Sequence, residues 1–128
     1  MRIEEYFETV RATVDLCAWV QSSSLTFDQR GSYEGFLRGE VYFLDGSVLH
    51  LREFVDCEVT VERLTYAYQY LDVEHHLVFR YDNTGHHRKL NLPTYPHHKH
   101  EGSEERVIVS DAPTLAAVLG EIGRLVHL

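Results

Sequence analysis

The sequence predicts an α+β fold, in which an antiparallel meander of about five strands is covered on one face by an N-terminal and a C-terminal helix. Three observations predict this fold. Apolar residues recur at helical spacing at both ends of the chain, β-branched and aromatic residues dominate the middle, and an Asp-Gly pair separates two apolar runs. Because both helices would cover the same face, the expected architecture is a two-layer sandwich whose other sheet face is open.

The length and composition indicate one globular domain spanning residues 1–128. A chain of 128 residues can bury a hydrophobic core without disulfides, and a hydrophobic content of 44% with a charged content of 25% is ordinary for such a protein. No apolar run approaches the roughly 18 residues of a membrane helix. Glu4 and Glu5 come too early for a secretory signal. We therefore expect a cytoplasmic protein that has no membrane partner.

Two elements are expected before the centre of the chain. Residues 2–12 carry apolar side chains at helical spacing and contain neither Gly nor Pro, so they predict a short helix. Residues 13–28 are rich in Val, Thr, Ser and aromatic side chains, which predicts a strand, bulged around residues 22–24.

A hairpin is expected over residues 36–55, where an Asp-Gly pair separates two apolar runs. Asp-Gly favours a two-residue turn, because both central residues of that turn have positive φ. Such a turn would place Arg38 opposite Glu53, and the two side chains would then form a favourable cross-strand charge pair.

A second hairpin is expected over residues 63–82, with a polar loop near its middle. Three residues alternate along its first strand and therefore share one face: Tyr66, Tyr68 and Tyr70. This tyrosine row could lie on the open face as a stacking platform, or it could be half-buried sheet packing. A five-residue loop would put Arg80 and Asp82 on the tyrosine face, and a slip of one residue would exchange the faces.

The last third of the chain is less regular. Residues 83–105 hold two of the three prolines and are expected to form an ordered but irregular loop, followed by a short strand at residues 107–109. A helix is then expected to open at residues 111–114, where Asp and Pro are typical start residues. Its amphipathic pattern runs to about residue 126.

Histidines are concentrated in the irregular loop, since five of the nine lie between positions 86 and 100. Histidine exchanges protons near neutral pH and is a common metal ligand, so this loop is the first candidate functional site. The net charge of −8 argues against a general nucleic-acid binder, yet residues 80–100 hold four basic residues against one acidic residue. This segment can receive a phosphate, while the acidic remainder suits a basic partner protein or solubility.

Four segments carry a resemblance to a known family: residues 52–55, 64–70, 79–83 with His86-His87, and 96–100. In sequence and in order, together with the helices and hairpins around them, they resemble the TumE-type family of small bacterial and archaeal toxins from toxin–antitoxin modules. The resemblance extends from Tyr6 to Ile122. It implies a toxin whose partner is a cognate antitoxin, typically a small helix-turn-helix protein.

The first hypothesis is an endoribonuclease that cleaves RNA by metal-independent acid–base catalysis. His98 and His100 are the favoured catalytic pair, because residues two apart in an extended segment point the same way. His86 would approach from the start of the loop, and Asp82 would orient one imidazole. Substrate contacts are expected from cationic, aromatic and further imidazole side chains: Arg80, Lys99, Tyr66, Tyr68, Tyr70, His87 and His97.

Two other functions stay open from the sequence. The first hypothesis needs no cofactor, but Asp82, His86, His98 and His100 could instead hold a zinc or manganese ion in a metal-dependent hydrolase. The protein could also be a non-enzymatic module that binds a protein partner. Whether the chain is an enzyme at all is therefore left open, and a homodimer is compatible with an open sheet face.

Overall fold

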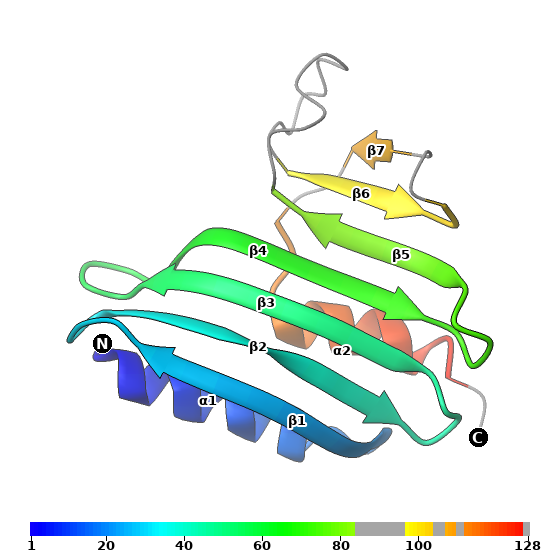
Figure 1. The fold of residues 1–128 in the computed structure, drawn as a ribbon, viewed down its shortest axis with the longest axis horizontal. Coiled ribbons are helices and arrows are strands. Elements are labelled where there is room, and N and C mark those ends of the chain that lie inside the picture. Colours follow the sequence, from blue (N-terminus) through cyan, green and yellow to red (C-terminus); the bar gives the residue numbers. More distant parts are fainter. Residues whose placement is uncertain (84–96, 104–106, 110–111, 127–128) are drawn as a thin grey trace.

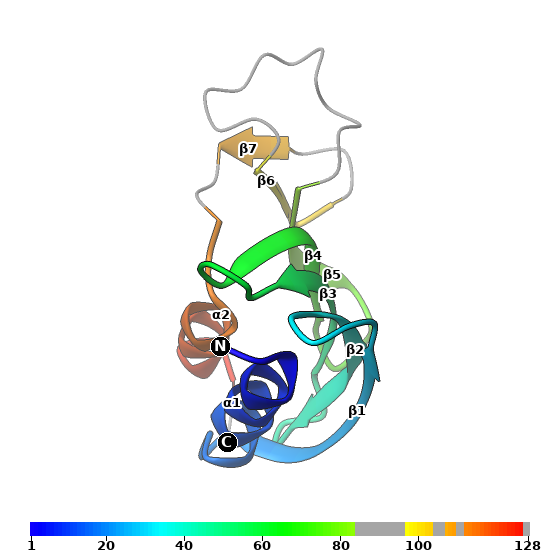
Figure 2. The same cartoon turned by 90° about the vertical axis from the view of Figure 1, so that its left-hand side faces the viewer.

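A computed structural model describes residues 1–83, 97–103, 107–109 and 112–126 (Figure 1). Nine elements follow one another along this described part of the chain: α1 (Ile3–Asp15), β1 (Val20–Gln29), β2 (Glu34–Phe43), β3 (Val48–Asp56), β4 (Glu62–Leu71), β5 (Leu77–Asp82), β6 (His98–Glu101), β7 (Val107–Val109) and α2 (Leu115–Gly123). The strands form one antiparallel sheet in sequence order. Both helices lie on the same side of it (Figure 2). The predicted α+β meander is confirmed.

In the described part of the chain the sheet has seven strands, where the sequence predicts a meander of about five. One of the two others is β7, which is the short strand expected at residues 107–109, and the second is β6, which lies in the segment expected to be irregular. β6 pairs with β5 on one side and with β7 on the other. Its four residues are His, Lys, His and Glu. No apolar alternation marks such a segment as a strand, so only its pairing with β5 reveals it.

The hydrophobic core lies between the sheet and the two helices. α1 contributes Val10 and Val14, while Val118 and Ile122 come from α2. The layers are also joined by a hydrogen bond in which Trp19 Nε1 donates to the carbonyl oxygen of a residue in α2 at 3.0 Å. Within the described residues, neither helix is long and apolar enough to cross a membrane.

The first hairpin has the predicted position but a different register. Residues 44–46 form a three-residue loop, in which Gly46 has φ +90°. The two-residue turn that the sequence predicts would have put Phe43 opposite Val48, whereas Tyr42 occupies that position. Asp-Gly is also compatible with a three-residue loop that ends on a left-handed glycine, and this loop displaces every pair by one residue.

The displacement changes which charges meet. Arg38 lies opposite Arg52, so the predicted pair with Glu53 is wrong. Glu53 instead lies opposite Leu37 on the helix-covered face, and both side chains are 0% exposed. The face that packs against the helices thus gains a buried carboxylate, while the open face gains two neighbouring arginines.

The second hairpin is displaced too, for a different reason. Pairing begins as predicted beside the loop, but a bulge next to Tyr70 shifts the following pairs by one residue and places Tyr70 opposite Phe79. The tyrosine row consequently faces the helices, and Arg80 and Asp82 lie on the open face. The predicted sharing of one face by the tyrosines, Arg80 and Asp82 is wrong, because this register places the aromatic rings on the face that packs against the helices and the charged pair on the other face.

Candidate functional site

Two rows of cross-strand partners cross the open face of the sheet, which is the face opposite the helices. We call the first the arginine row, and its members are Thr26, Arg38, Arg52, Ala67, Asp82 and His98. The second, the histidine row, lies beside it: Ser24, Glu40, His50, Gln69, Arg80 and His100. Three predicted catalytic positions, Asp82, His98 and His100, therefore stand at one end of rows that reach back to β1.

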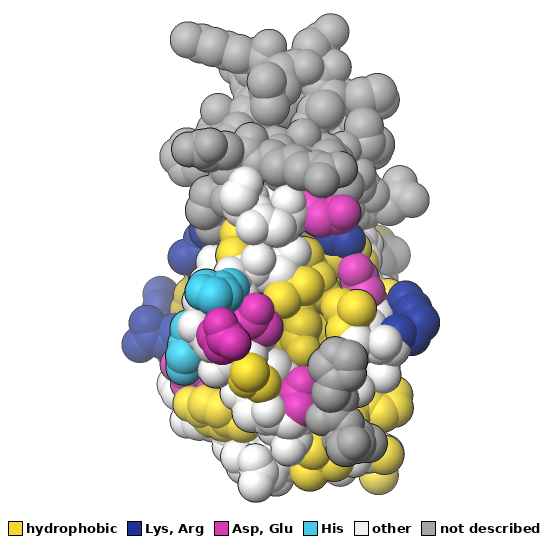
Figure 3. Space-filling view, turned by 90° about the vertical axis from the view of Figure 1, so that its right-hand side faces the viewer, with side chains coloured by type: hydrophobic (Ala, Val, Ile, Leu, Met, Phe, Trp, Pro, Cys, Tyr) yellow, Lys and Arg dark blue, Asp and Glu magenta, His cyan; other side chains and the backbone are white. Residues whose placement is uncertain are grey.

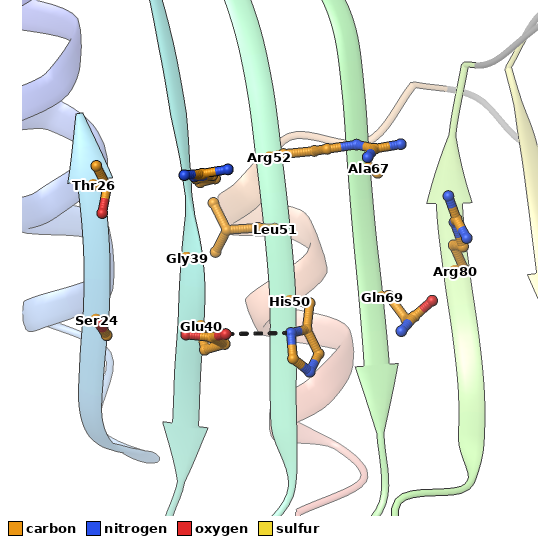
Figure 4. Close-up of a pocket in the computed structure, with 11 residues that line it drawn as sticks. Ser24, Thr26, Gly39, Glu40, His50, Leu51, Arg52, Ala67, Gln69 and Arg80 are labelled. Atoms are coloured by element: carbon orange, nitrogen blue, oxygen red, sulfur yellow. Dashed lines mark ion pairs between the residues drawn. The ribbon is translucent and has the colours of Figure 1, made fainter. Parts of the chain in front are cut away.

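The members of the two rows on β1 to β4, together with Arg80 on β5, line a depression of about 520 Å³ (Figure 4). Of the side chains that the structure describes, those of Asp82 and His100 are not among the ones that line it. In Figure 4, Arg52 extends from β3 across β4 above Ala67, whose small side chain leaves room for it. Arg80 lies beyond it on β5, next to Gln69 on β4. A hollow of this size, lined by guanidinium, amide and hydroxyl groups, suits an anionic ligand.

The electrostatics of this depression are dominated by arginine. Arg38 and Arg52 are exposed and directly opposite each other. Neither forms an ion pair with any residue that the structure describes. Among the described residues, the one carboxylate that lines the depression belongs to Glu40, whose Oε1 lies 3.7 Å from His50 Nδ1. Like charges that face each other across strands destabilise a sheet. The stability of the fold therefore does not account for this arginine pair, and binding of an anionic ligand would.

A buried charged cluster ends the two rows. Asp82 Oδ2 lies 3.0 Å from Arg80 Nε and 3.7 Å from His100 Nε2. Asp82 is 1% exposed and His100 is 4% exposed. A carboxylate that contacts an imidazole can orient the ring, and a guanidinium beside them can stabilise charge on a phosphate. The predicted roles of these three residues are thus geometrically compatible.

Two predicted substrate-binding residues, His97 and Lys99, lie on the opposite side of the sheet. His97 Nδ1 is 2.8 Å from the Tyr66 hydroxyl, and the two rings are stacked with centroids 5.7 Å apart. Lys99 Nζ is 2.9 Å from Glu121 Oε2 and lies 4.8 Å from the ring centroid of Tyr81. Burial lowers the pKa of Lys99, but hydrogen bonds with Tyr81 and Glu121 outweigh it and raise the pKa above its ordinary value. His97 and Lys99 are thus separated from Asp82 and His100 by the sheet.

The tyrosine row is part of the core. Tyr66, Tyr68 and Tyr70 are 2%, 0% and 3% exposed. The Tyr68 hydroxyl donates to Glu53, and that of Tyr70 donates to Ser47 Oγ at 2.8 Å. A base cannot stack on rings that are packed beneath two helices, so the predicted stacking platform is replaced by sheet packing.

Several predicted residues lie outside the described part of the chain. His86 and His87 belong to residues 84–96, and for His98 only the register position opposite Asp82 is described. Among the described residues, no group of three or more His, Cys, Asp and Glu side chains is placed to hold a metal ion. The alternative ligand set of Asp82, His86, His98 and His100 therefore stays a prediction.

The sequence did not predict the site residues that the two rows contribute from β2, β3 and β4. Arg38, Arg52, His50 and Gln69 line the depression, but none of them was a predicted site residue. A signal was present, since polar side chains alternate with buried apolar ones along β2 and β3. This pattern does not reveal a cationic surface in the predicted hairpin register, because that register pairs Arg38 with the opposite charge of Glu53.

A second depression, of about 370 Å³, lies at the end of the molecule where the β2–β3 and β4–β5 loops meet the end of α2 (Figure 3). It is lined by both acidic and apolar side chains: Asp45, Tyr70, Asp72, Val73, Glu74, Val78 and Leu125. Negative charge at this end disfavours a phosphate ligand. The two depressions thus differ in sign, and only the one on the open face fits an anion.

Comparison with known proteins assigns the chain to a family. The model of the family described as toxin TumE matches residues 9–126, which is almost the whole chain. No curated protein and no solved structure matches this chain. A match of this extent supports a role as the toxin component of a toxin–antitoxin module, which has a cognate antitoxin as its partner. The chain therefore belongs to the TumE toxin family.

Proposed function

We propose that this toxin acts on RNA in the cytoplasm and cleaves it without a metal ion, at the end of the open face where Asp82, Arg80 and His100 meet. The observation that supports this proposal most is the buried contact of an imidazole, a carboxylate and a guanidinium beside a cationic depression. An imidazole can transfer a proton at a phosphodiester, and a guanidinium can stabilise the negative charge that develops on its oxygens.

The reaction that suits these groups uses the 2′-hydroxyl of RNA. A general base takes the hydroxyl proton, the 2′-oxygen forms a bond to the adjacent phosphorus, and the bond from phosphorus to the 5′-oxygen breaks as a general acid protonates that oxygen. The products are a 2′,3′-cyclic phosphate and a 5′-hydroxyl. His100 is one of the two proton-transfer groups, and Asp82 orients it. Arg80 offsets charge on the phosphoryl oxygens.

The second proton-transfer group comes from the same segment. His98 shares the arginine row with Asp82, and His86 is the other candidate. Since only 4% of His100 is exposed, the proposal also requires the chain around β6 to open when RNA binds. Local opening of a short strand near a sheet edge is among the cheapest motions of a fold.

The test is cleavage of purified cellular RNA in the presence of EDTA. We expect cleavage to persist with EDTA and to fall by about a hundredfold or more in His100→Ala and in His100→Gln, since each proton-transfer group contributes about 10²–10⁴-fold. His75→Ala is the matched control, because His75 is exposed in the β4–β5 loop. The glutamine variant keeps most of the buried volume. Equal activity of wild type and both His100 variants would refute the assignment.

The same experiment separates the two alternatives. Cleavage that stops with EDTA and returns with zinc or manganese would favour a metal-dependent hydrolase that uses Asp82, His86, His98 and His100. A toxin that arrests growth but cleaves no RNA would favour the non-enzymatic binding module. Normal growth on expression without the antitoxin would contradict toxicity itself.

The partner proposal is a helix-turn-helix antitoxin that forms a stable complex with this chain. Co-expression of the neighbouring gene product should restore growth, and the two proteins should elute together in size-exclusion chromatography. The mass of the toxin alone in light scattering then decides between a monomer and the homodimer that an open sheet face allows.

A further inference from the structure

We propose that Arg38 and Arg52, together with the neighbouring Phe36 and Phe54, form a second binding site on the open face, which holds single-stranded RNA several nucleotides away from the reacting phosphate. This inference rests on the proposed function, because the ligand is the same RNA. It adds a subsite on β2 and β3 that the reaction itself does not require.

The charge of the arginine pair is the first argument. Arg38 and Arg52 are exposed and face each other across β2 and β3, with no ion pair to any described residue. Opposed like charges weaken the sheet, and a ligand that carries several negative charges relieves that repulsion. Arginine binds phosphate through two parallel N–H donors, which lysine cannot do.

The position of the pair is the second argument. Arg38 and Arg52 belong to the same cross-strand row as Asp82, with only the small Ala67 between Arg52 and Asp82. Two strand spacings separate Arg52 from Asp82, a distance of about 10 Å. A stacked strand places one phosphate about every 3.4 Å along its axis. A strand along this row would therefore have about three nucleotides between the arginine pair and the acid–base cluster.

The aromatic neighbours are the third argument. Phe36 and Phe54 are cross-strand partners in the row next to Arg38 and Arg52, and both are partly exposed. Aromatic faces stack unpaired bases, and a basic groove with aromatic side chains is typical of proteins that bind single strands. An acidic protein segment would bind to the arginines through its carboxylates, but it has no bases to stack on the phenyl rings. This combination favours single-stranded RNA over an acidic protein.

The direct test is binding of an RNA that cannot be cleaved, a 2′-O-methyl oligonucleotide of about ten nucleotides, followed by fluorescence anisotropy at several salt concentrations. We expect the double variant Arg38→Gln/Arg52→Gln to bind at least about tenfold more weakly. Each lost phosphate contact should also reduce the slope of log K against log salt by about 0.7, so the double variant loses about 1.4.

Two controls accompany this measurement. Arg11→Gln/Arg124→Gln removes the same charge from exposed positions on the helix layer, and it should retain most of the affinity and the slope. Phe54→Leu keeps an apolar side chain but removes the ring, so it should weaken binding about fivefold or more if a base stacks there. Phe7→Leu on α1 serves as its matched control.

Kinetics then distinguish this subsite from the acid–base cluster. Arg38→Gln/Arg52→Gln should raise KM for the oligonucleotide and leave kcat within about twofold, and it should cleave a dinucleotide as wild type does. If the double variant binds and cleaves the oligonucleotide as well as the wild type does, the subsite is refuted while the proposed function stands. RNA binding that depends on the arginines, without any cleavage, would refute the proposed reaction and keep the subsite. If the wild type binds no RNA, or only antitoxin affinity depends on the arginines, this inference fails.

Discussion

Glu53 is a fully buried carboxylate in the centre of the sheet. It accepts hydrogen bonds from the hydroxyls of Tyr6 on α1 and Tyr68 on β4. Burial and the nearby negative charge of Glu53 raise the pKa of both tyrosines, so both hydroxyls keep their protons and act as donors at neutral pH. Arg63 donates to the Tyr68 hydroxyl at 2.9 Å and adds a positive charge nearby. A buried charge is tolerated here because its oxygens are hydrogen-bonded.

We predict that Tyr68→Phe lowers the free energy of unfolding by about 1–3 kcal/mol, because it removes one of the donors to a buried charged group. Tyr70→Phe is the matched control on the same strand, and its hydroxyl donates to the neutral Ser47 Oγ at 2.8 Å. Its loss should be smaller, about 0.5–1.5 kcal/mol. Urea denaturation of the two variants measures the difference, and an equal loss would contradict the importance of the Glu53 charge.

The two hairpins show what loops decide at the scale of elements. Their positions follow from local signals, because turn residues and apolar alternation mark where a strand ends. Their registers do not. One extra residue in the β2–β3 loop and one bulge beside Tyr70 are local differences of a single residue, yet each changes which side chains share a face of the sheet. Packing against α1 and α2 selects the register that buries the tyrosines.

The end of α2 gives a prediction at the same scale. A Cβ at Gly123 would lie 2.6 Å from Cζ2 of Trp19, whereas a Cβ at Gly120 would meet nothing within 4 Å. Gly123→Ala should therefore lower the free energy of unfolding by about 1–3 kcal/mol, since the rigid indole must shift. Gly120→Ala should raise it by up to about 1 kcal/mol through helix propensity. Thermal unfolding followed by circular dichroism compares them, and opposite signs are the expected result.

For the whole molecule, the sheet acts as a wall between two sets of polar groups. The helix-covered side holds the tyrosines with Glu53, His97 and Lys99. The hydrogen bond from Tyr6 to Glu53 connects the sheet to α1, and that from Lys99 to Glu121 connects it to α2. The open side holds the arginine row and the histidine row. Residues that are adjacent in the chain, such as Lys99 and His100, thereby take part in different interactions.

Alkaline stability is a property of the whole molecule that follows from its buried tyrosines. Burial is the main cause that raises the pKa of Tyr66 to about 12. Below pH about 10 the hydroxyl is protonated in both the folded and the unfolded chain, so the contribution to stability is fully present. As the pH rises towards 12, only the unfolded chain releases the proton, and stability falls. The pKa values of Tyr6 and Tyr68 are raised further than that of Tyr66, so these two residues continue the loss of stability at still higher pH.

The corresponding measurement is the urea midpoint at a series of pH values from about 8 to 12. We expect a plateau up to pH about 10, then a steady decrease with the appearance of tyrosinate absorbance on unfolding. Tyr66→Phe removes one of these ionisable hydroxyls and should flatten part of the decline. A midpoint that stays constant to pH about 12 would contradict the burial of ionisable tyrosines.

The sequence by itself determined the fold class, the places of both helices and both hairpins, and the histidine-rich segment as the first candidate site. These features depend on local patterns and on a family resemblance that the match to residues 9–126 confirms. The pairing of β6 with β5, which brings His100 beside Asp82 and Arg80, came only from the structure. Only the tertiary structure decided the faces and the registers, and with them the exposure of Arg38 opposite Arg52 and the burial of the tyrosines. The physical reason is that side chains alternate with a period of two along a strand, so a displacement of one residue, selected by packing against the helices, changes the surroundings of every charge.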